Sequence, residues 1–321
     1  MRVLSGVQPS GILHVGNYFG AIRQFLQMQE EHECYYFLAD YHALTTVQEK
    51  DRLRGLVSDL AAAFLAFGLD PEKSVLYRQS DIPEIPELTW YLSTVTSMGL
   101  LQRCHSCKDK VSQGVVPSHG LFSYPVMMAA DILIVNSDMV PVGKDQKQHL
   151  EVTRDITGAF HTTYDTEVFT LPKPMILDNV AVVPGIDGRK MSKSYGNTID
   201  IFGAEKPIRK AIMSITTDST PVEEPKPTEG STLYQLARVF APEGEREWVE
   251  TAFREGGTGY GTIKKQLFGW FRETFGPARA RFDELKADPE AVEAVLVDGA
   301  RRAREEIAPL MDKVRKAVGI R

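Results

Sequence analysis

The sequence has few cysteines, no long apolar run and no excess of positive charge. Three cysteines among 321 residues cannot build a disulfide framework, so we expect a protein of the reducing cytoplasm. No segment approaches the roughly 20 apolar residues that cross a bilayer, and the first residues lack the pattern of a signal peptide, so we expect no membrane partner. The net charge of −6 argues against nonspecific binding of nucleic acid over the whole surface.

The charge is unevenly distributed along the chain. Basic residues slightly outnumber acidic ones after Gly256, whereas the part before it is clearly acidic. This distribution permits a localised contact with a polyanion, but a solvated helical surface would give the same balance of charge.

The first part of the chain alternates apolar runs of strand length with helical patterns. We expect strands over Arg2–Val7, Cys34–Asp40 and Ser74–Gln79, separated by a helix after Gly16 and a second over Lys50–Phe67. This alternation predicts an α/β fold, a doubly wound parallel sheet with helices on both faces. Ligands of such sheets bind at the carboxyl ends of the strands.

The second part of the chain changes from mixed to helical patterns. We expect helices near Tyr124–Asn136 and Asp145–Phe160, with strands at Met139–Val142 and Val180–Pro184. The proline-rich segment Asp218–Ser231 is typical of a surface linker. The helices expected after it cover Thr232–Phe240, Arg246–Glu255, Tyr260–Phe275, Pro277–Ala287 and Pro289–Ile320. We therefore expect a sheet-containing domain over residues 1–200 and an all-helical C-terminal domain over residues 201–321.

A glycine-containing turn, Pro9–Asn17, separates the first expected strand from the first helix. Such a turn directs backbone N–H groups, and the positive end of the helix dipole, at an anion. It is neither a dinucleotide fingerprint nor a P-loop, because Asn17 stands where a P-loop has lysine. His14 and Asn17 can contact a phosphate chain without a permanent ion pair. A tight turn that binds no ligand would also explain the glycines.

A second loop, Gly188–Asn197, places Lys190 and Lys193 three residues apart among glycines and hydroxyl residues. Flexible ammonium groups suit the charge that develops on a leaving pyrophosphate. The alternative is a solvated basic turn. Together the two loops predict an enzyme that binds ATP between them and uses it to activate a carboxylate.

The same loops carry a resemblance to a known family. Lys190–Ser194 resembles the KMSKS signature of class I aminoacyl-tRNA synthetases, and His14–Asn17 resembles their HIGH signature, with Asn17 at the fourth position as in many tryptophan and tyrosine enzymes. Gly6–Gly11 and Val140–Gln146 are similar to the bacterial tryptophan-specific branch, although Lys144 replaces an acid found in most members. The resemblance implies a Rossmann-like catalytic domain, activation of L-tryptophan by ATP with Mg²⁺, and transfer to the 3′ end of tRNA(Trp).

The resemblance also implies roles for individual residues. His14, Asn17, Lys190 and Lys193 are expected to be catalytic, through contacts with the phosphates. The ATP-binding residues implied are Gln8, Pro9, Ser10, Gly16, Asn17, Gly143, Asp145, Gln146, Lys190, Met191, Ser192, Lys193 and Ser194. Lys108 and Lys110 align with a segment that reaches the pyrophosphate, but they could equally be a solvated basic turn.

We expect the run Tyr124–Asp131, within the helix near Tyr124–Asn136, to decide which amino acid is bound. Tyr124, Met128 and Asp131 fall on one helical face. Met128 suits packing on an aromatic ring, and the resemblance implies that Asp131 accepts a hydrogen bond from the indole N–H. An ordinary core helix with a buried aspartate is the alternative. The tryptophan-binding residues implied are Leu4, Gln8, His42, Tyr124, Met128, Asp131, Ile132, Val140, Val142 and Gln146.

The remaining expectations concern partners and metals. The resemblance implies a homodimer, with a segment at about 84–170 that serves dimerisation and substrate binding. It also implies an anticodon-recognising surface on the helical end, for which the candidates are Lys264, Lys265, Arg301, Arg302 and Arg304. Cys104 and Cys107 have the C-x-x-C spacing of a metal site, but further ligands are lacking, so we expect no metal held by protein ligands.

Two other functions remain open. A tyrosine enzyme of the same class is disfavoured by Met128 and by Gly143–Gln146. A small-molecule nucleotidyltransferase, or a paralogue that only binds nucleotide or RNA, would share the two loops but should lack the long helical end.

Overall fold

Five parallel strands form the central sheet of the computed structural model, which describes residues 1–104, 116–142, 147–176 and 183–320. Their order across the sheet is β3–β2–β1–β4–β5. The strands are β1 (Arg2–Val7), β2 (Glu33–Leu38), β3 (Ser74–Arg78), β4 (Met139–Val142) and β5 (Lys173–Ile176). The order reverses between β1 and β4, which is where such sheets bind ligands. The predicted doubly wound sheet is confirmed.

The helices between strands cover the two faces of the sheet. The connections contain α1 (Val15–Asn17), the π-helical turn η1 (Tyr18–Ile22), α2 (Arg23–Met28), α3 (Asp40–Ala43), α4 (Lys50–Ala66), the 3₁₀ turn η2 (Gln79–Asp81), α5 (Glu84–Val95), α6 (Met98–Arg103), α8 (His119–Ile134) and α9 (Lys147–Tyr164). Strand residues alternate between the faces. Leu4 and Tyr77 pack with α5, α8 and α9, whereas Val3 and Leu76 pack with α2 and α4.

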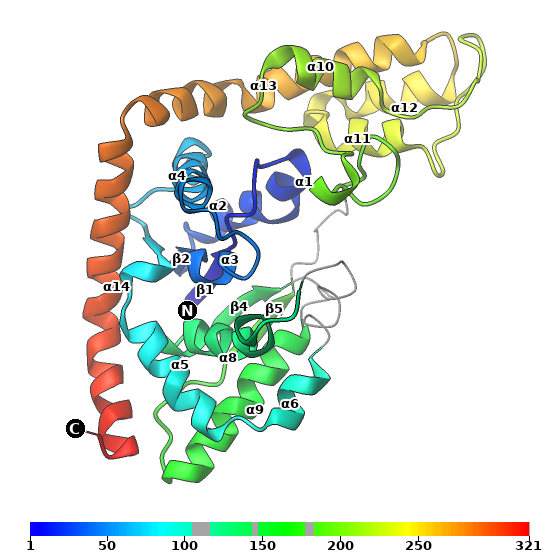
Figure 1. The fold of residues 1–321 in the computed structure, drawn as a ribbon. Coiled ribbons are helices and arrows are strands. Elements are labelled where there is room, and N and C mark those ends of the chain that lie inside the picture. Colours follow the sequence, from blue (N-terminus) through cyan, green and yellow to red (C-terminus); the bar gives the residue numbers. More distant parts are fainter. Residues whose placement is uncertain (105–115, 143–146, 177–182, 321) are drawn as a thin grey trace.

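The C-terminal part is helical, as predicted, and begins after a short 3₁₀ turn, η3 (Lys193–Tyr195). It contains α10 (Glu205–Met213), α11 (Thr232–Phe240), the turn η4 (Glu243–Glu245), α12 (Arg246–Arg254), α13 (Tyr260–Ala287) and α14 (Pro289–Val318). Helices α10 to α13 pack around Trp270 and Phe275 in a core that also includes Val15 of α1 and Met191. Figure 1 shows α10, α11 and α12 gathered at one end of the molecule, with α13 leading back from them to α14.

Helix α14 lies along the outer strand β3 and completes the sheet domain (Figure 1). Val292 and Leu296 join the core on one face of the sheet, whereas Ala303 and Ile307 join the core on the other face. Gly299 makes this approach possible, because a Cβ there would lie 1.8 Å from the carbonyl oxygen of Leu76. The last helix is therefore part of the structure that positions the strand ends.

Some predicted elements differ from those observed. Tyr260–Phe275 and Pro277–Ala287 form one helix, α13, because the burial of Phe275 and Leu285 on either side outweighs the hydrogen bond lost at Pro277. Strand β5 was not predicted, since Pro174 and Lys173 weaken its pattern; a proline is tolerated at a sheet edge. The strand predicted at Val180–Pro184 lies mostly outside the described residues, and Pro184 forms only an isolated bridge with Lys190.

In the described part of the chain, no helix is long and apolar enough to span a membrane.

Candidate active site

The two loops singled out in the sequence lie against each other, although 175 residues separate their contacting atoms. The backbone N–H of Gly16 donates to Sδ of Met191 (3.3 Å), and the N–H of Val15 donates to the carbonyl of Ile199 (3.0 Å). A Cβ on Gly11 would lie 3.4 Å from the Nζ of Lys193. The predicted proximity of Pro9–Asn17 and Lys190–Ser194 is therefore observed, at the carboxyl end of β1.

His14 is the most perturbed residue of the first loop. Its side chain is only 6% exposed, and its Nδ1 has no hydrogen-bond partner among the described residues. Burial, with a smaller contribution from the positive charge of Lys193, lowers the pKa of His14 to about 4. The imidazole is therefore neutral at physiological pH. The side-chain oxygen of Asn17 has a structural role, since its Oδ1 accepts from the backbone N–H of His14 (3.1 Å).

The second loop is held by Asn197, a residue that the sequence did not single out. Its Oδ1 accepts from the N–H of Ser192 (2.8 Å), and its Nδ2 donates to Oδ1 of Asp187 (2.7 Å) and to the carbonyl of Lys190 (3.2 Å). Gly185 leaves room for this buried amide. Lys190 and Ser194 are exposed, and partial desolvation lowers the pKa of Lys193. Asn197 thus fixes the base of a loop whose cations remain accessible.

A cavity of about 390 Å³ opens beside the loops, between the carboxyl ends of β1 and β4. It contains nine of the ten residues implied for tryptophan binding, and the tenth, Gln146, lies outside the described residues. The cavity is lined by Leu4, Ser5, Gly6, Gln8, Phe37, Ala39, His42, Tyr124, Met128, Asp131, Ile132, Val140, Pro141, Val142, His149 and Leu150. Its wall is mostly apolar, with few polar groups, which is typical of a small-molecule site.

Asp131 is the buried carboxylate of this cavity, and its side chain is 1% exposed. Nε2 of Gln79 donates to both of its oxygens (2.8 and 3.0 Å), and Nε2 of His42 lies 2.7 Å from Oδ2. Burial raises the pKa of Asp131, whereas the contacts with His42 and Gln79 oppose that rise. Carboxylate oxygens offer about four acceptor directions, so the carboxylate retains acceptor capacity for a further donor. Gln79 was not predicted as a site residue.

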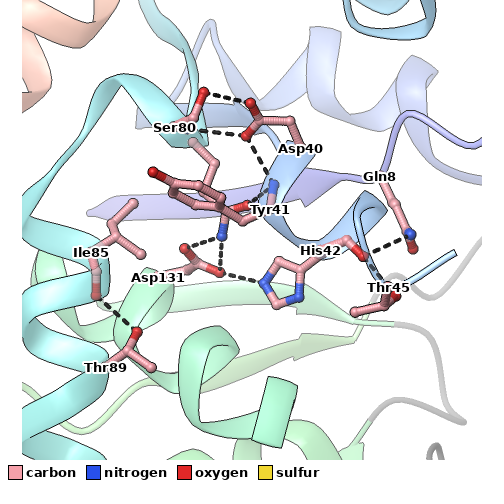
Figure 2. Close-up of polar contacts among 10 residues, drawn as sticks. Gln8, Asp40, Tyr41, His42, Thr45, Ser80, Ile85, Thr89 and Asp131 are labelled. Carbon is pink, nitrogen blue, oxygen red and sulfur yellow. Dashed lines mark hydrogen bonds and ion pairs between the residues drawn. The ribbon is translucent and has the colours of Figure 1, made fainter. Parts of the chain in front are cut away.

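The one-turn helix α3 connects the cavity with the first loop (Figure 2). The carbonyl of His42 accepts from Nε2 of Gln8 (3.2 Å) and from the hydroxyl of Thr45 (2.8 Å). At the start of the helix, Asp40 accepts from the N–H of Tyr41 (3.0 Å) and from the N–H (3.0 Å) and hydroxyl (2.5 Å) of Ser80. The segments that follow β1, β2 and β3 are therefore joined into one polar frame.

Several predicted site residues are outside the described part of the chain. These are Lys108, Lys110, Gly143, Asp145 and Gln146, together with Cys107 of the C-x-x-C pair. Cys104 is buried, and its Sγ lies 3.5 Å from the carbonyl of Leu100. Within the described residues, no group of three His, Cys, Asp or Glu side chains could hold a metal ion.

The candidate anticodon residues do not form one free cationic surface. Lys264 donates to the carbonyl of Ile215 (2.6 Å), Arg304 pairs with Glu84 (2.7 Å), and Arg301 pairs with Asp298 (2.7 Å). Arg302 donates to backbone carbonyls beside β3. Lys265 is exposed, but it lies on α13, whereas the three arginines lie on α14. The arginines thus attach α14 to its neighbours and to itself, and the recognition of the anticodon by these residues stays a prediction.

Comparison with known proteins agrees with this geometry. The profile of the family described as tRNA synthetases class I (W and Y) matches residues 1–276. The tryptophan–tRNA ligase of Rhodopirellula baltica is 53% identical over 321 residues, which cover 100% of both chains. That of Campylobacter jejuni is 48% identical over 320 residues, again 100% of both chains.

Solved structures of tryptophanyl-tRNA synthetases are also similar to this chain. The crystal structure of the Campylobacter jejuni tryptophanyl-tRNA synthetase with ADP and tryptophan superposes with a TM-score of 0.94 at 48% identity, covering 99% of this chain and 100% of that one. The tryptophanyl-tRNA synthetase of Mycoplasma pneumoniae gives a TM-score of 0.83 at 26% identity, with 99% and 97% coverage. This chain belongs to the class I tRNA synthetases of the tryptophan and tyrosine type.

Proposed function

We propose that the protein is a tryptophan–tRNA ligase, which activates L-tryptophan with ATP and then transfers it to the 3′ end of tRNA(Trp). One observation carries the choice of tryptophan: Asp131, a buried carboxylate with remaining acceptor capacity, lies in an apolar cavity next to the two ATP loops. The full-length relatives of 47–53% identity carry the same activity in their names.

In the first step, the tryptophan carboxylate attacks the α-phosphate of ATP, and the bond to pyrophosphate breaks. The buried, neutral His14 and the accessible Lys190 and Lys193 suit the binding of the phosphates, and the lysines suit the charge on the departing pyrophosphate. In the second step, a ribose hydroxyl of the terminal adenosine attacks the carbonyl carbon, and AMP leaves. The rate depends on positioning and electrostatics, because neither step requires a protein nucleophile.

ATP is expected to bring Mg²⁺ on its phosphates. Among the described residues, no cluster of His, Cys, Asp or Glu side chains would hold the ion without the phosphates. The Campylobacter jejuni structure is a complex with ADP and tryptophan, which supports the binding of a nucleotide by this chain. Of the proposed ATP-binding residues, Gln8, Gly16 and Met191 lie at the junction of the loops and α3.

The tryptophan side chain is proposed to lie between Met128, Ile132, Val140 and Val142, with its N–H directed to Asp131. Leu4 forms part of the cavity wall, and Tyr124 packs edge-on against His42 with 6.0 Å between the ring centroids. A tyrosine enzyme is the weaker candidate, because Met128 offers the phenol hydroxyl no hydrogen-bonding amide.

We also propose a homodimer and a division into a catalytic unit over residues 1–200 and a helical unit over 201–321. The last helix of the helical unit, α14, packs back onto the sheet of the catalytic unit. Trp90 and Met98, on α5 and α6, are 69% and 62% exposed, as is common for a surface that a second copy covers. Light scattering of the purified protein tests this proposal, and a monomer at micromolar concentration would contradict it.

The exchange of labelled pyrophosphate into ATP tests the proposed activity. We expect exchange with tryptophan, and none above background with tyrosine or without an amino acid. Exchange with tyrosine alone would assign the second specificity. Absence of exchange with every amino acid would favour a nucleotidyltransferase or a nucleotide-binding paralogue.

A further inference from the structure

Gln79 is a fully buried amide at the start of η2 that the reaction itself does not use. It donates to the carboxylate of Asp131, which lies on α8, and it contacts the backbone of α3 through Tyr41. We propose that Gln79 is a positioning residue that keeps Asp131 in the hydrogen-bond-accepting form, and thereby makes the cavity select a side chain with an N–H donor. This inference rests on the proposed function and deepens it.

The orientation of the Gln79 amide follows from its two partners. The backbone N–H of Tyr41 lies 3.1 Å from Oε1 and can only donate, so this atom must be the amide oxygen. The NH₂ group must then face Asp131, where it lies 2.8 and 3.0 Å from the two carboxylate oxygens. The opposite orientation would place two donors together at Tyr41 and two acceptors together at Asp131. The backbone N–H of Tyr41 therefore sets the orientation of the Gln79 amide, and the NH₂ group of that amide holds the carboxylate of Asp131 in place.

The turn that carries Gln79 is itself held in place. Asp40 accepts from both the backbone N–H and the hydroxyl of Ser80, the next residue in the chain. The same Asp40 caps the N–H of Tyr41, which donates to Gln79. The carboxylate of Asp40 therefore joins the backbone at Tyr41 to the backbone at Ser80, and the Gln79 amide lies between them. It has little freedom to turn away from Asp131.

The second neighbour of Asp131 does not impose the same constraint. The ring nitrogen of His42 can donate to a carboxylate or accept from a protonated acid, so its 2.7 Å contact suits either state. The NH₂ group of Gln79, which faces Asp131, can only donate. Burial favours the protonated acid, and the contacts with His42 and Gln79 both oppose it, but only the Gln79 contact has a fixed direction. An ionised acceptor binds an N–H donor more strongly than a neutral acid does, and it gives nothing to an isostere that lacks the hydrogen.

The test compares tryptophan with 3-benzothienylalanine, in which sulfur replaces the indole N–H. The measured quantity is the ratio of kcat/KM for the two amino acids in pyrophosphate exchange. In Gln79→Met, which keeps the length but neither donates nor accepts, we expect the ratio to fall about 10-fold relative to the unchanged protein. The fall should come from a higher KM for tryptophan, with kcat little changed.

Thr157→Val supplies the matched control. Thr157 is fully buried on α9, and its hydroxyl donates only to the carbonyl of Thr153 (2.8 Å), outside the cavity. This variant loses a buried hydrogen bond without touching Asp131. We expect its tryptophan-to-benzothienylalanine ratio to equal that of the unchanged protein, even if its thermal stability falls.

Gln79→Glu gives an independent test that does not depend on how well Gln79→Met folds. A protonated Glu at this position can still donate to Asp131 and accept from Tyr41, whereas an ionised Glu repels the carboxylate. The ratio should therefore approach that of the unchanged protein at low pH and decline as the pH rises. Asp40 and His42 from α3 and Tyr77 from β3 also face Asp131. The ratio is therefore measured in the unchanged protein at the same pH values, and only the difference between the two proteins is assigned to position 79.

Each outcome leads to a distinct conclusion. A ratio in Gln79→Met equal to that of the unchanged protein, or a ratio in Gln79→Glu that equals it at every pH, overturns the inference and leaves Gln79 a packing residue. If the unchanged protein shows no exchange with tryptophan, the proposed function fails instead. If the unchanged protein uses tryptophan and 3-benzothienylalanine equally well, Asp131 does not distinguish an indole N–H from sulfur, and the inference also fails.

Discussion

Lys193 lies close to His14 where the two loops meet, and its positive charge adds to burial in lowering the pKa of His14 to about 4. The two groups belong to segments far apart in the chain, which Gly16 and Met191 hold together. This pair thus consists of one neutral ring and one cation, rather than two cations. Two predictions follow from this pair.

The stability of the protein should depend on the protonation of His14. The pKa in the folded state, about 4, lies below the ordinary value of 6.5, so the unfolded chain takes up the proton first as the pH falls. The contribution of the neutral ring is therefore complete above pH 6.5 and is lost progressively toward pH 4. We expect the unfolding free energy of the unchanged protein, relative to His14→Asn, to decrease by at most about 1.4 kcal/mol per pH unit in this window. Urea unfolding at several pH values measures it, and a constant difference would refute the prediction.

Replacing Lys193 should impair the chemical step more than the binding of tryptophan. In Lys193→Met we expect pyrophosphate exchange to slow by about 10²-fold, since one group that stabilises developing charge is lost. The affinity for tryptophan should stay the same, as measured by equilibrium dialysis. The pKa of His14 should rise, which an NMR titration detects, because a neighbouring positive charge is gone. Lys206→Met, at an exposed lysine on α10, is the control and should change none of these quantities.

The contact between α14 and β3 should tolerate no added atom. Gly299→Ala places a methyl group 1.8 Å from the carbonyl oxygen of Leu76, so the helix must move outward. We expect the free energy of unfolding to fall by about 1–3 kcal/mol. Gly55→Ala is the matched control, since Gly55 is also helical but has open space around its Cβ position. There we expect a gain of up to about 1 kcal/mol. Equal effects of the two substitutions would contradict this view of the interface.

Replacing Asp131 by asparagine should weaken the selection for tryptophan. The new amide would either face the NH₂ group of Gln79 with its own NH₂ group, or direct that group into the cavity. Both arrangements leave the indole N–H a poorer acceptor. We expect kcat/KM for tryptophan to fall and the discrimination against phenylalanine to relax by at least about 10-fold. Asp138→Asn is the control, because Asp138 accepts from the backbone N–H of Arg2 outside the cavity. Unchanged discrimination in Asp131→Asn would rule out its proposed role.

Much of the architecture could be predicted because it is encoded locally. The apolar runs at Arg2–Val7 and Met139–Val142 became strands with the expected limits, and the motif residues of the two loops came together. The predicted boundary at Pro277 was wrong, because packing on both sides of the proline outweighs a local preference.

The supporting residues could not be predicted in the same way. Gln79 lies at the end of a predicted strand among the polar residues Arg78 and Ser80, so nothing in the local sequence distinguishes it. Its partners Tyr41 and Asp131 are 38 and 52 residues away. Asn197 binds the backbone of its own loop, but asparagine is common in turns, so the sequence does not show that this one is buried and holds the loop. The ion pairs of the basic residues on α14 could not be predicted either, because the sequence shows the charges but not their acidic partners, such as Glu84 for Arg304.

The position of α14 also has a consequence for the order of folding during synthesis. The strand that α14 covers is made more than 200 residues before the helix, so the ribosome releases β3 long before its partner exists. Until then Leu76 and Tyr77 lack part of their apolar cover, and nascent chains with uncovered strands are prone to association. The amino-acid cavity, whose Asp131 is supported from the end of β3, can reach its final form only when the last helix has been translated.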